Sequence, residues 1–297
     1  MSLPPQDWPH RAASHAIRCP PHDWHVQVLG DGGPDLLLLH GAGGASHSWA
    51  ALAPLLAGHR LIIPDLPGQG FTRPGRRDRF GLPAMAADLA RLCEAQGWRP
   101  AALIGHSAGA AIALELTGVM ADPPRAVVGI NAALAPFDGL AGWLFPLMAR
   151  AMATSPFVAP AVAWMASQPR QVDRLLDSTG SLIDVRGRAL YRMLAGRTQH
   201  VDGTLAMMAA WRLQPLIARM PEITLPVLLL AGATDGAVPP RVSAAAARRL
   251  GDAEFVELPA LGHLAHEEDA ATVAAVLRPW LDARLAGSGQ GRRGLGV

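Results

Sequence analysis

The 297-residue sequence contains no lysine, and all 26 of its basic residues are arginine. Schiff-base enzymes, pyridoxal-phosphate enzymes and P-loop ATPases each depend on a lysine side chain, so these three classes are excluded. Cysteine is almost as scarce, because only Cys19 and Cys93 occur and neither has a CxxC partner. The sequence therefore predicts neither a disulfide framework nor a thiolate metal site, and it fits a reducing, cytoplasmic setting.

Charged residues make up only 17% of the chain, and the net charge is +2. This near balance gives no electrostatic footprint for nucleic acid, so we expect no nucleic-acid partner. The histidines are scattered and form no H-E-x-x-H or equivalent pair, so we expect no metal site and no cofactor. The amino-terminal residues include Asp7 and Arg11 and lack an apolar run, which does not fit a secretory signal.

The longest uncharged stretch covers residues 151–169, but it contains Pro156, Pro160 and Pro169. Prolines at these positions argue against a helix that spans a membrane. Tryptophan, phenylalanine and methionine are frequent in this part of the chain, which leaves contact with a membrane surface open. The alternative is that these side chains form core or pocket lining.

Half of all residues are apolar, and between residues 15 and 130 short apolar runs alternate with helix-like stretches. This alternation predicts an α/β fold with a mostly parallel central sheet flanked by helices, because strands buried on both faces form continuous apolar runs. The clearest predicted strands are Leu36–Leu39, Leu61–Ile63, Ala102–Ile104 and Val127–Ile130. Upstream, Trp24–Leu29 alternates apolar and polar residues, which predicts an antiparallel edge strand.

Between about Ala135 and Pro215 the pattern is helical and no strand-like run occurs, and strands resume at Val227–Leu230 and Glu254–Leu258. Such a block predicts a helical cap inserted after the sixth strand, over the edge where open sheets bind ligands. We expect residues 1–134 and 216–286 to form the core and residues 135–215 to form the cap. Residues 287–297 contain five glycines and are predicted to be a disordered tail.

The segment Gly105-His106-Ser107-Ala108-Gly109 follows a predicted strand and precedes an apolar helical run. This is the G-x-S-x-G nucleophile elbow in the strand, turn and helix context that it requires. Small residues are needed because the sharp turn brings strand and helix together. A glycine-rich turn with a solvated serine is the alternative. We interpret Ser107 as a candidate nucleophile.

A second glycine-rich segment, His40-Gly41-Ala42-Gly43-Gly44, directly follows the strand of four leucines. Acyl transfer builds negative charge on an oxygen, which two fixed backbone amides can stabilise. We predict the amides of Ala42 and Ala108 as this oxyanion hole. The loop does not match the G-x-G-x-x-G dinucleotide fingerprint, and His40 is better interpreted as a structural residue than as a base.

Two residues downstream can complete this chemistry. Asp235 and His263 each lie in a loop past the carboxyl end of a predicted strand. A serine hydroxyl needs a base to remove its proton, and the base needs an acid to fix its tautomer. The chain order Ser, Asp, His is that of the α/β-hydrolases. We therefore predict Ser107, Asp235 and His263 as a catalytic triad, with Asp138 as an alternative acid and His266 as an alternative base.

Two further segments accompany the predicted site. Pro64–Gly70 follows a strand and is interpreted as a structural turn, with Asp65 organising the loop. An arginine cluster lies just beyond it and could receive an anionic ligand, although a solvated loop is the simpler interpretation. The cluster consists of Arg73, Arg76, Arg77 and Arg79.

Over nearly all of residues 15–285, the chain that carries these motifs resembles the α/β-hydrolase fold proteins. It is more closely similar to the magnesium-chelatase accessory proteins of bacteriochlorophyll biosynthesis, the BchO type. The shared text includes WPHRAAS, WHVQVLG, LLLLHGAGG, PDLPGQGFT, GHSAGAAIAL, LLDSTGS, LAMMAAW and LPALGHLAHEE. The triad motifs are general to the superfamily, and the opening, DLPGQGFT and LAMMAAW narrow the match. Gln69 departs from the histidine often found at its position in these hydrolases.

The resemblance implies a serine hydrolase acting on an ester or related carbonyl, in or beside the magnesium-chelatase step. Its implied partners are a small-molecule substrate, such as a porphyrin intermediate, and chelatase subunits, in the cytoplasm or at the periphery of the photosynthetic membrane. The cap would supply aromatic and methionine side chains for a flat macrocycle, and Arg150 or Arg192 could meet its propionates. The candidate pocket residues are Trp143, Phe145, Met148, Trp164, Met208 and Trp211.

Three alternatives stay open on the sequence alone. The cap residues can simply pack against the core, with solvated arginines around them. The protein can be a tetrapyrrole-binding accessory protein whose hydrolysis is incidental. It can also be a general carboxylesterase without a link to the pathway.

Overall fold

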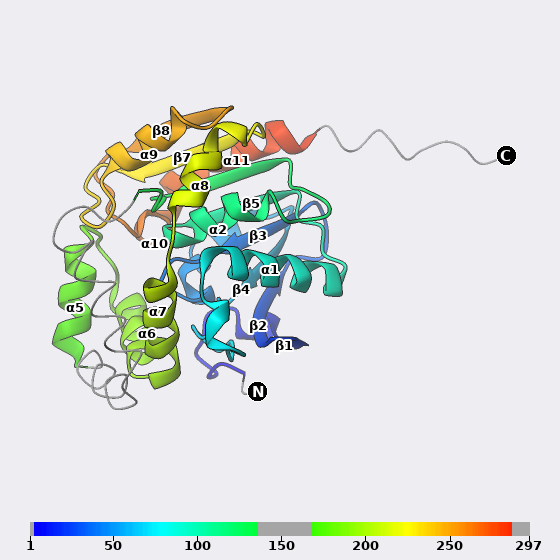
Figure 1. The fold of residues 1–297 in the computed structure, drawn as a ribbon. Helices are drawn as coiled ribbons and strands as arrows, with labels where there is room; N and C mark the ends of the chain where they lie inside the picture. Colours follow the sequence, from blue (N-terminus) through cyan, green and yellow to red (C-terminus); the bar gives the residue numbers. More distant parts are fainter. Residues whose placement is uncertain (1–2, 136–167, 287–297) are drawn as a thin grey trace.

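The structure is a computed structural model that describes residues 3–135 and 168–286 (Figure 1). In these residues eight strands form one sheet, in the order β1-β2-β4-β3-β5-β6-β7-β8. The strands are β1 (Ser14–Cys19), β2 (His22–Leu29), β3 (Asp35–Leu39), β4 (Arg60–Pro64), β5 (Ala102–His106), β6 (Ala126–Ile130), β7 (Val227–Gly232) and β8 (Ala253–Leu258).

The strands from β3 to β8 run parallel to one another, whereas β1 and β2 are antiparallel to their neighbours. The prediction of a mostly parallel sheet is therefore confirmed. The prediction that Trp24–Leu29 forms an edge strand is wrong, because β2 pairs with β1 on one side and with β4 on the other. The true edge, Ser14–Cys19, is half-exposed and lacks an apolar run, so its sequence gave no strand signal.

Helices connect the strands and cover both faces of the sheet (Figure 1). They are α1 (Leu82–Gln96), α2 (Ala108–Leu116), α5 (Pro169–Ser178), α6 (Val185–Ala195), α7 (Thr198–Ala210), α8 (Gln214–Arg219), α9 (Pro240–Ala247), α10 (Ala265–Glu268) and α11 (Ala270–Leu285). Short 3₁₀ helices are η1 (Arg11–Ala13), η2 (Ser46–Trp49), η3 (Ala53–Leu56), η4 (Arg77–Arg79) and η5 (Met220–Glu222).

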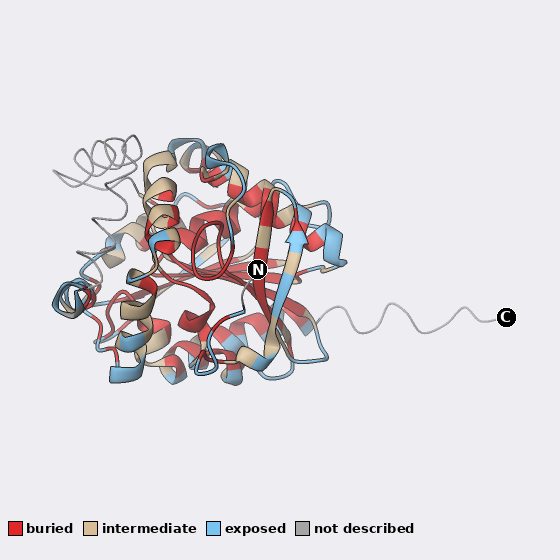
Figure 2. Cartoon of the chain, turned by 90° about the horizontal axis from the view of Figure 1, so that it is seen from below, coloured by how far each residue is buried: buried red, intermediate tan, exposed pale blue. Residues whose placement is uncertain are grey.

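Successive residues of the central strands face opposite sides of the sheet, and each side has its own core. Along β3, Leu37 and Leu39 pack in a cluster with residues of α1 and α2, whereas Leu36 and Leu38 pack in a cluster with residues of α11. Figure 2 shows the central strands almost entirely buried. Burying each leucine stabilises the fold by about 2 kcal/mol, so this two-sided core fixes the strand ends on which the loops depend.

A buried carboxylate holds together the loops at the carboxyl ends of β3 and β4. Asp65 accepts hydrogen bonds from Nδ1 of His25 at 2.7 Å and from the amides of Ser46 and Phe71 at 2.6 and 2.8 Å. Burial acts to raise the pKa of Asp65, but attraction to His25 and these hydrogen bonds outweigh it, so that its pKa lies well below the usual value. The carboxylate is charged and links β2 to both loops.

Two buried histidines complete this support by accepting backbone hydrogen bonds. Nε2 of His40 accepts from the amide of Leu66 at 2.9 Å, and Nδ1 of His200 accepts from the amide of Gly70 at 2.9 Å. Each ring must therefore be neutral, since a protonated nitrogen cannot accept. Burial lowers the pKa of His40. It also lowers the pKa of the neighbouring His47 to about 3 and the pKa of His200 to about 4.

We expect the free energy of unfolding to fall as the pH drops from about 6.5 toward 4. Because the folded pKa values of these histidines are lowered, the unfolded chain binds more protons below about 6.5, and stability is lost as acid is added. Each buried histidine contributes a slope of up to about 1.4 kcal/mol per pH unit. The melting temperature at pH 7.5, 6 and 5 measures this slope.

The matched pair of variants is His200→Gln, which removes one buried group, and His15→Gln, which removes a histidine at an exposed position. His200→Gln should have a shallower pH dependence of the melting temperature than the parent chain, and His15→Gln should keep the parent dependence. An equal pH dependence of the melting temperature in all three proteins would contradict the assignment of this dependence to the buried His200.

Candidate active site

Ser107 stands in the tight turn between β5 and α2. Its backbone has φ 52° and ψ −117°, which places a non-glycine residue at positive φ. The flanking glycines are required by close packing: a Cβ on Gly105 would collide with the amide nitrogen of Ala110, and one on Gly109 would collide with the carbonyl oxygen of Leu39. The turn therefore holds the serine side chain at the end of the sheet in a strained, fixed geometry.

Three side chains that are distant in the sequence meet at this turn. Nε2 of His263 lies 3.1 Å from Oγ of Ser107, and Nδ1 of His263 lies 2.8 Å from Oδ2 of Asp235. Ser107 follows β5, Asp235 follows β7 and His263 follows β8, so the sheet order brings the three loops to one edge. Both contacts are within hydrogen-bond range.

Asp235 is fixed by more than the histidine. Its Oδ1 accepts from the amides of Ala237 at 2.8 Å and Val238 at 2.7 Å, and its Oδ2 also accepts from Nδ2 of Asn131 at 2.7 Å. Asn131, which follows β6 with a positive φ of 48°, was not predicted as a site residue. The position immediately after a buried strand was the available signal. With these contacts the carboxylate can only present Oδ2 to His263.

His106, the residue before Ser107, anchors the histidine loop. Its Nε2 donates to the carbonyl oxygen of His263 at 2.9 Å. Burial, together with the nearby His266 and His263, holds the pKa of His106 well below its usual range, so the ring is neutral. His266 is itself fully buried, and burial lowers its pKa to about 3. It is His263 that lies within hydrogen-bond range of Ser107.

The glycine-rich loop after β3 lies close against the turn that contains Ser107. A Cβ on Gly41 would lie 3.0 Å from Cβ of Ser107. Ala108 is the first residue of α2, so its amide has no acceptor within the helix. The amide of Gly43 donates to Oε1 of Gln69 at 2.8 Å, which fixes the loop next to Ala42. Ala108 is next to Ser107 in the chain, and Ala42 lines the same cavity as Ser107, so their role as the oxyanion hole stays a prediction.

A cavity of about 460 Å³ opens above Ser107 and His263. Among the described residues that line it there is no arginine, aspartate or glutamate. Its cap side is mainly apolar and is contributed by α5, α6 and α7, through Val172, Leu175, Leu176, Ala195, Val201 and Leu205. The cavity is thus suited to an uncharged, apolar part of a ligand.

Of the residues that were predicted to line the substrate pocket, the structure describes Met208 and Trp211. Met208 and Trp211 are not among the described residues that line this cavity, which reach only the earlier turns of α7, and Trp211 packs against the main core. Their assignment to a substrate pocket stays a prediction. The remaining candidates lie outside the described residues, as do the alternative acid Asp138 and Arg150; they are Trp143, Phe145, Met148 and Trp164.

Four of the arginines that were considered for anion binding are held by carboxylates, and Arg73 pairs with Asp23 through its backbone. Arg192 donates to both oxygens of Asp173, at 2.8 and 2.7 Å, and it does not line the cavity. In the arginine cluster, the three pairs are Arg76 with Asp78, Arg77 with Asp202, and Arg79 with Asp88. These contacts leave no reason to assign an anion site to them.

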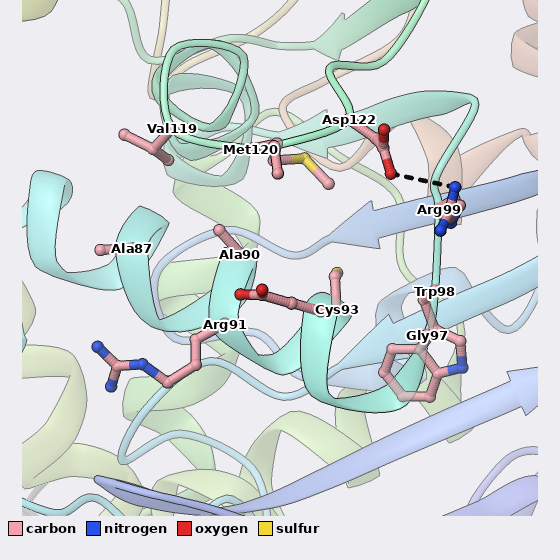
Figure 3. A pocket seen from close by; sticks show the side chains of 12 residues that line it. Ala87, Ala90, Arg91, Cys93, Gly97, Trp98, Arg99, Val119, Met120 and Asp122 are labelled. Atoms are coloured by element: carbon pink, nitrogen blue, oxygen red, sulfur yellow. Dashed lines mark ion pairs between the residues drawn. The ribbon is translucent and has the colours of Figure 1, made fainter.

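A separate cavity of about 330 Å³ lies between the end of α1 and the turn that follows α2 (Figure 3). Its walls include Cys93, Trp98, Arg99 and Met120, with Arg99 paired to Asp122 at 3.5 Å. Burial raises the pKa of Cys93 to about 12, so its thiol is not a nucleophile. This cavity contains none of the candidate catalytic residues.

Within residues 3–135 and 168–286, no cluster of three or more histidine, cysteine, aspartate or glutamate side chains is arranged to hold a metal ion. None of the helices in the same ranges has the length and apolar character needed to cross a membrane.

Comparison with known proteins places this geometry in a family. The family model for the alpha/beta hydrolase fold matches residues 34–270. The chain is 48% identical over 280 residues to the Magnesium-chelatase 30 kDa subunit of Rhodobacter capsulatus, with 94% of this chain and 98% of that protein covered. It is 30% identical over 275 residues to Lipase LipV of Mycobacterium tuberculosis, with 88% and 99% covered.

Solved structures show the same fold at low sequence identity. The epoxide hydrolase CorEH matches with a TM-score of 0.75 and 18% identity, over 91% of this chain and 98% of that one. A thermophilic esterase from Thermogutta terrifontis matches with a TM-score of 0.69 and 23% identity, over 92% and 98%. The chain belongs to the α/β-hydrolase fold family, and within it to the family that includes the Magnesium-chelatase 30 kDa subunit of Rhodobacter capsulatus.

Proposed function

We propose that this protein is a serine hydrolase that cleaves an ester or related carbonyl compound in or beside the magnesium-chelatase step of bacteriochlorophyll biosynthesis. The observation that supports hydrolysis most directly is the chain of contacts from Ser107 through His263 to Asp235, at 3.1 and 2.8 Å. Nothing in the packing of the core requires these three polar groups together. The link to the pathway is supported by the 48% identical relative that is named a magnesium-chelatase subunit.

In the first half of the reaction, Nε2 of His263 removes the proton from Oγ of Ser107, and Oγ attacks the carbonyl carbon. Asp235 keeps Nδ1 of the imidazole protonated and stabilises the imidazolium that forms. The negative oxygen of the tetrahedral intermediate is held by the amides of Ala42 and Ala108, each contributing about 3 kcal/mol.

In the second half, the bond from the carbonyl carbon to the leaving oxygen breaks, and His263 gives its proton to the leaving alcohol. A water molecule then attacks the acyl group on Ser107, with His263 again as base, and the acid is released. The apolar cavity receives an uncharged portion of the substrate, and any carboxylate groups of a tetrapyrrole stay outside the part of the cavity that is described.

A second candidate function is a tetrapyrrole-binding protein that assists the chelatase while its hydrolysis is incidental. The name of the relative favours it, because a subunit contributes through association with other subunits. In either case we place the protein in the cytoplasm or at the surface of the photosynthetic membrane, with a porphyrin intermediate and chelatase subunits as partners.

Replacing Ser107 with alanine is expected to abolish ester hydrolysis, by at least about 10⁴-fold in kcat, since the nucleophile is removed. The parent chain should form a covalent adduct with a serine-reactive phosphonate on Ser107, located by peptide mass spectrometry, and the variant should form none. An adduct at equal rate in the Ser107→Ala protein would refute the nucleophile.

The same variant separates the two functions. In a reconstituted magnesium-insertion assay, a folded Ser107→Ala protein that supports insertion fully favours the accessory role, and one that fails favours catalysis.

Replacing Asp235 with asparagine is expected to lower kcat by about 10⁴-fold while the fold is kept. The amides of Ala237 and Val238 already hold one oxygen, so the new NH₂ group would take the place of Oδ2 and face His263, with the side-chain amide of Asn131 turned so that its oxygen accepts. The imidazole would then carry its proton on Nε2 and could not accept one from Ser107. Steady-state kinetics measures the loss, and Asp31→Asn, at an exposed position, is the control with no expected change.

A further inference from the structure

One hydroxyl of the cap contacts both halves of the candidate catalytic centre. The hydroxyl of Tyr191, on α6, donates to Oε1 of Glu267 at 2.6 Å and lies 3.2 Å from Oγ of Ser48. Its ring packs edge-on against His47, with centroids 4.7 Å apart. Tyr191 is the single tyrosine of the chain.

The two partners belong to the segments that the proposed mechanism needs. Ser48 lies in η2, which continues directly from the glycine-rich loop that contains Ala42. Its amide donates to the carbonyl oxygen of Ala45 at 3.0 Å. Glu267 lies in α10, in the turn that begins immediately after His263, and its amide donates to the carbonyl oxygen of Leu264 at 2.8 Å.

The contacting side chains line two cavities. Tyr191 and Ser48 line the cavity that contains Ser107. Ser48 and Glu267 line a second cavity of about 470 Å³. The hydrogen bond from Tyr191 fixes the position of α6 relative to both loops, because moving the helix leaves a largely buried carboxyl without one of its donors.

We propose that Tyr191 is a positioning residue that connects α6 of the cap to the glycine-rich loop that contains Ala42 and to the loop that contains His263. Ser107 is then fully reactive only while α6 is held in this position. This inference rests on the proposed hydrolase function, whose chemistry it deepens. Tyr191 acts through Ser48 and Glu267 and does not touch the reacting atoms.

The strength of the hydrogen bond between Tyr191 and Glu267 depends on the protonation of Glu267. Burial raises the pKa of Glu267 to about 7, against the opposing hydrogen bonds from Tyr191 and Ser48. An ionised carboxylate is the stronger acceptor, so the hydrogen bond from Tyr191 becomes stronger as the pH rises through about 7 and weaker below it. The other titratable or charged groups around it or in the same cavity are His10, His47, Asp184, Arg186, His266 and Glu268.

The single tyrosine permits a direct measurement. With 3-fluorotyrosine incorporated, ¹⁹F NMR gives one resonance, at position 191. We expect its chemical shift to titrate near pH 7 in the parent chain and to show no such transition in Glu267→Gln. A titration that is unchanged by Glu267→Gln would overturn the coupling of Tyr191 to this carboxyl.

The reactivity of Ser107 is measured as the rate of inactivation by a serine-reactive phosphonate, together with kcat and KM for a short ester. Tyr191→Phe keeps the ring and removes only the hydroxyl. We expect it to lower the inactivation rate and kcat by about tenfold and to change KM by less than about twofold. Ser178→Ala, which removes another cap hydroxyl, one that donates to the carbonyl oxygen of Leu175, is the matched control and should react at the parent rate.

Glu267→Gln provides the second route to the same test if Tyr191→Phe folds poorly. The double variant Tyr191→Phe/Glu267→Gln should be no slower than Tyr191→Phe alone, because both changes break one connection. Additive losses, or an inactivation rate in Tyr191→Phe equal to that of the parent chain, would overturn the proposal. Labelling that persists in Ser107→Ala would instead overturn the hydrolase function, so the two failures are distinguishable.

Discussion

The sharp turn at the end of β5 is the constraint on which the rest of the site depends. Gly105 and Gly109 have no space for a side chain, and between them Ser107 takes a backbone conformation that few residues adopt. Strand β5 and helix α2 are thereby packed so closely that the hydroxyl of Ser107 is held in one position. The loop after β7 brings the carboxylate of Asp235 to that position, and the loop after β8 brings the imidazole of His263. Both reach it because of the order of the parallel strands in the sheet.

Much of this arrangement could be predicted from the sequence because its signals are local. The apolar runs of β3 to β8 are strong, since strands buried on both faces leave little room for polar residues. The same holds for the motif around Ser107, whose glycines report a steric requirement. Asp235 and His263 were identified by their positions after predicted strands, and the structure brings them within hydrogen-bond range of one another and of Ser107.

The residues that escaped prediction act through long-range contacts. Asn131 meets Asp235 across 104 positions of sequence, and Tyr191 meets Glu267 across 76. No periodicity or motif encodes such a pair, because either side chain alone is compatible with an ordinary loop or helix surface. Composition likewise identifies apolar side chains such as Met208 but not the face of α7 that the cavity above Ser107 reaches.

The carboxylate of Asp65 joins a strand of the amino-terminal hairpin to the loops that follow β3 and β4. The glycine-rich loop is therefore completed only when the first strands have docked, although they come before every candidate catalytic residue in the chain. During synthesis on the ribosome, the opening residues emerge early yet gain their function late, once the third and fourth strands are in place. A chain shortened past β2 would consequently lose the contact between His25 and Asp65, and with it one support of the glycine-rich loop, together with the strand that pairs with β4.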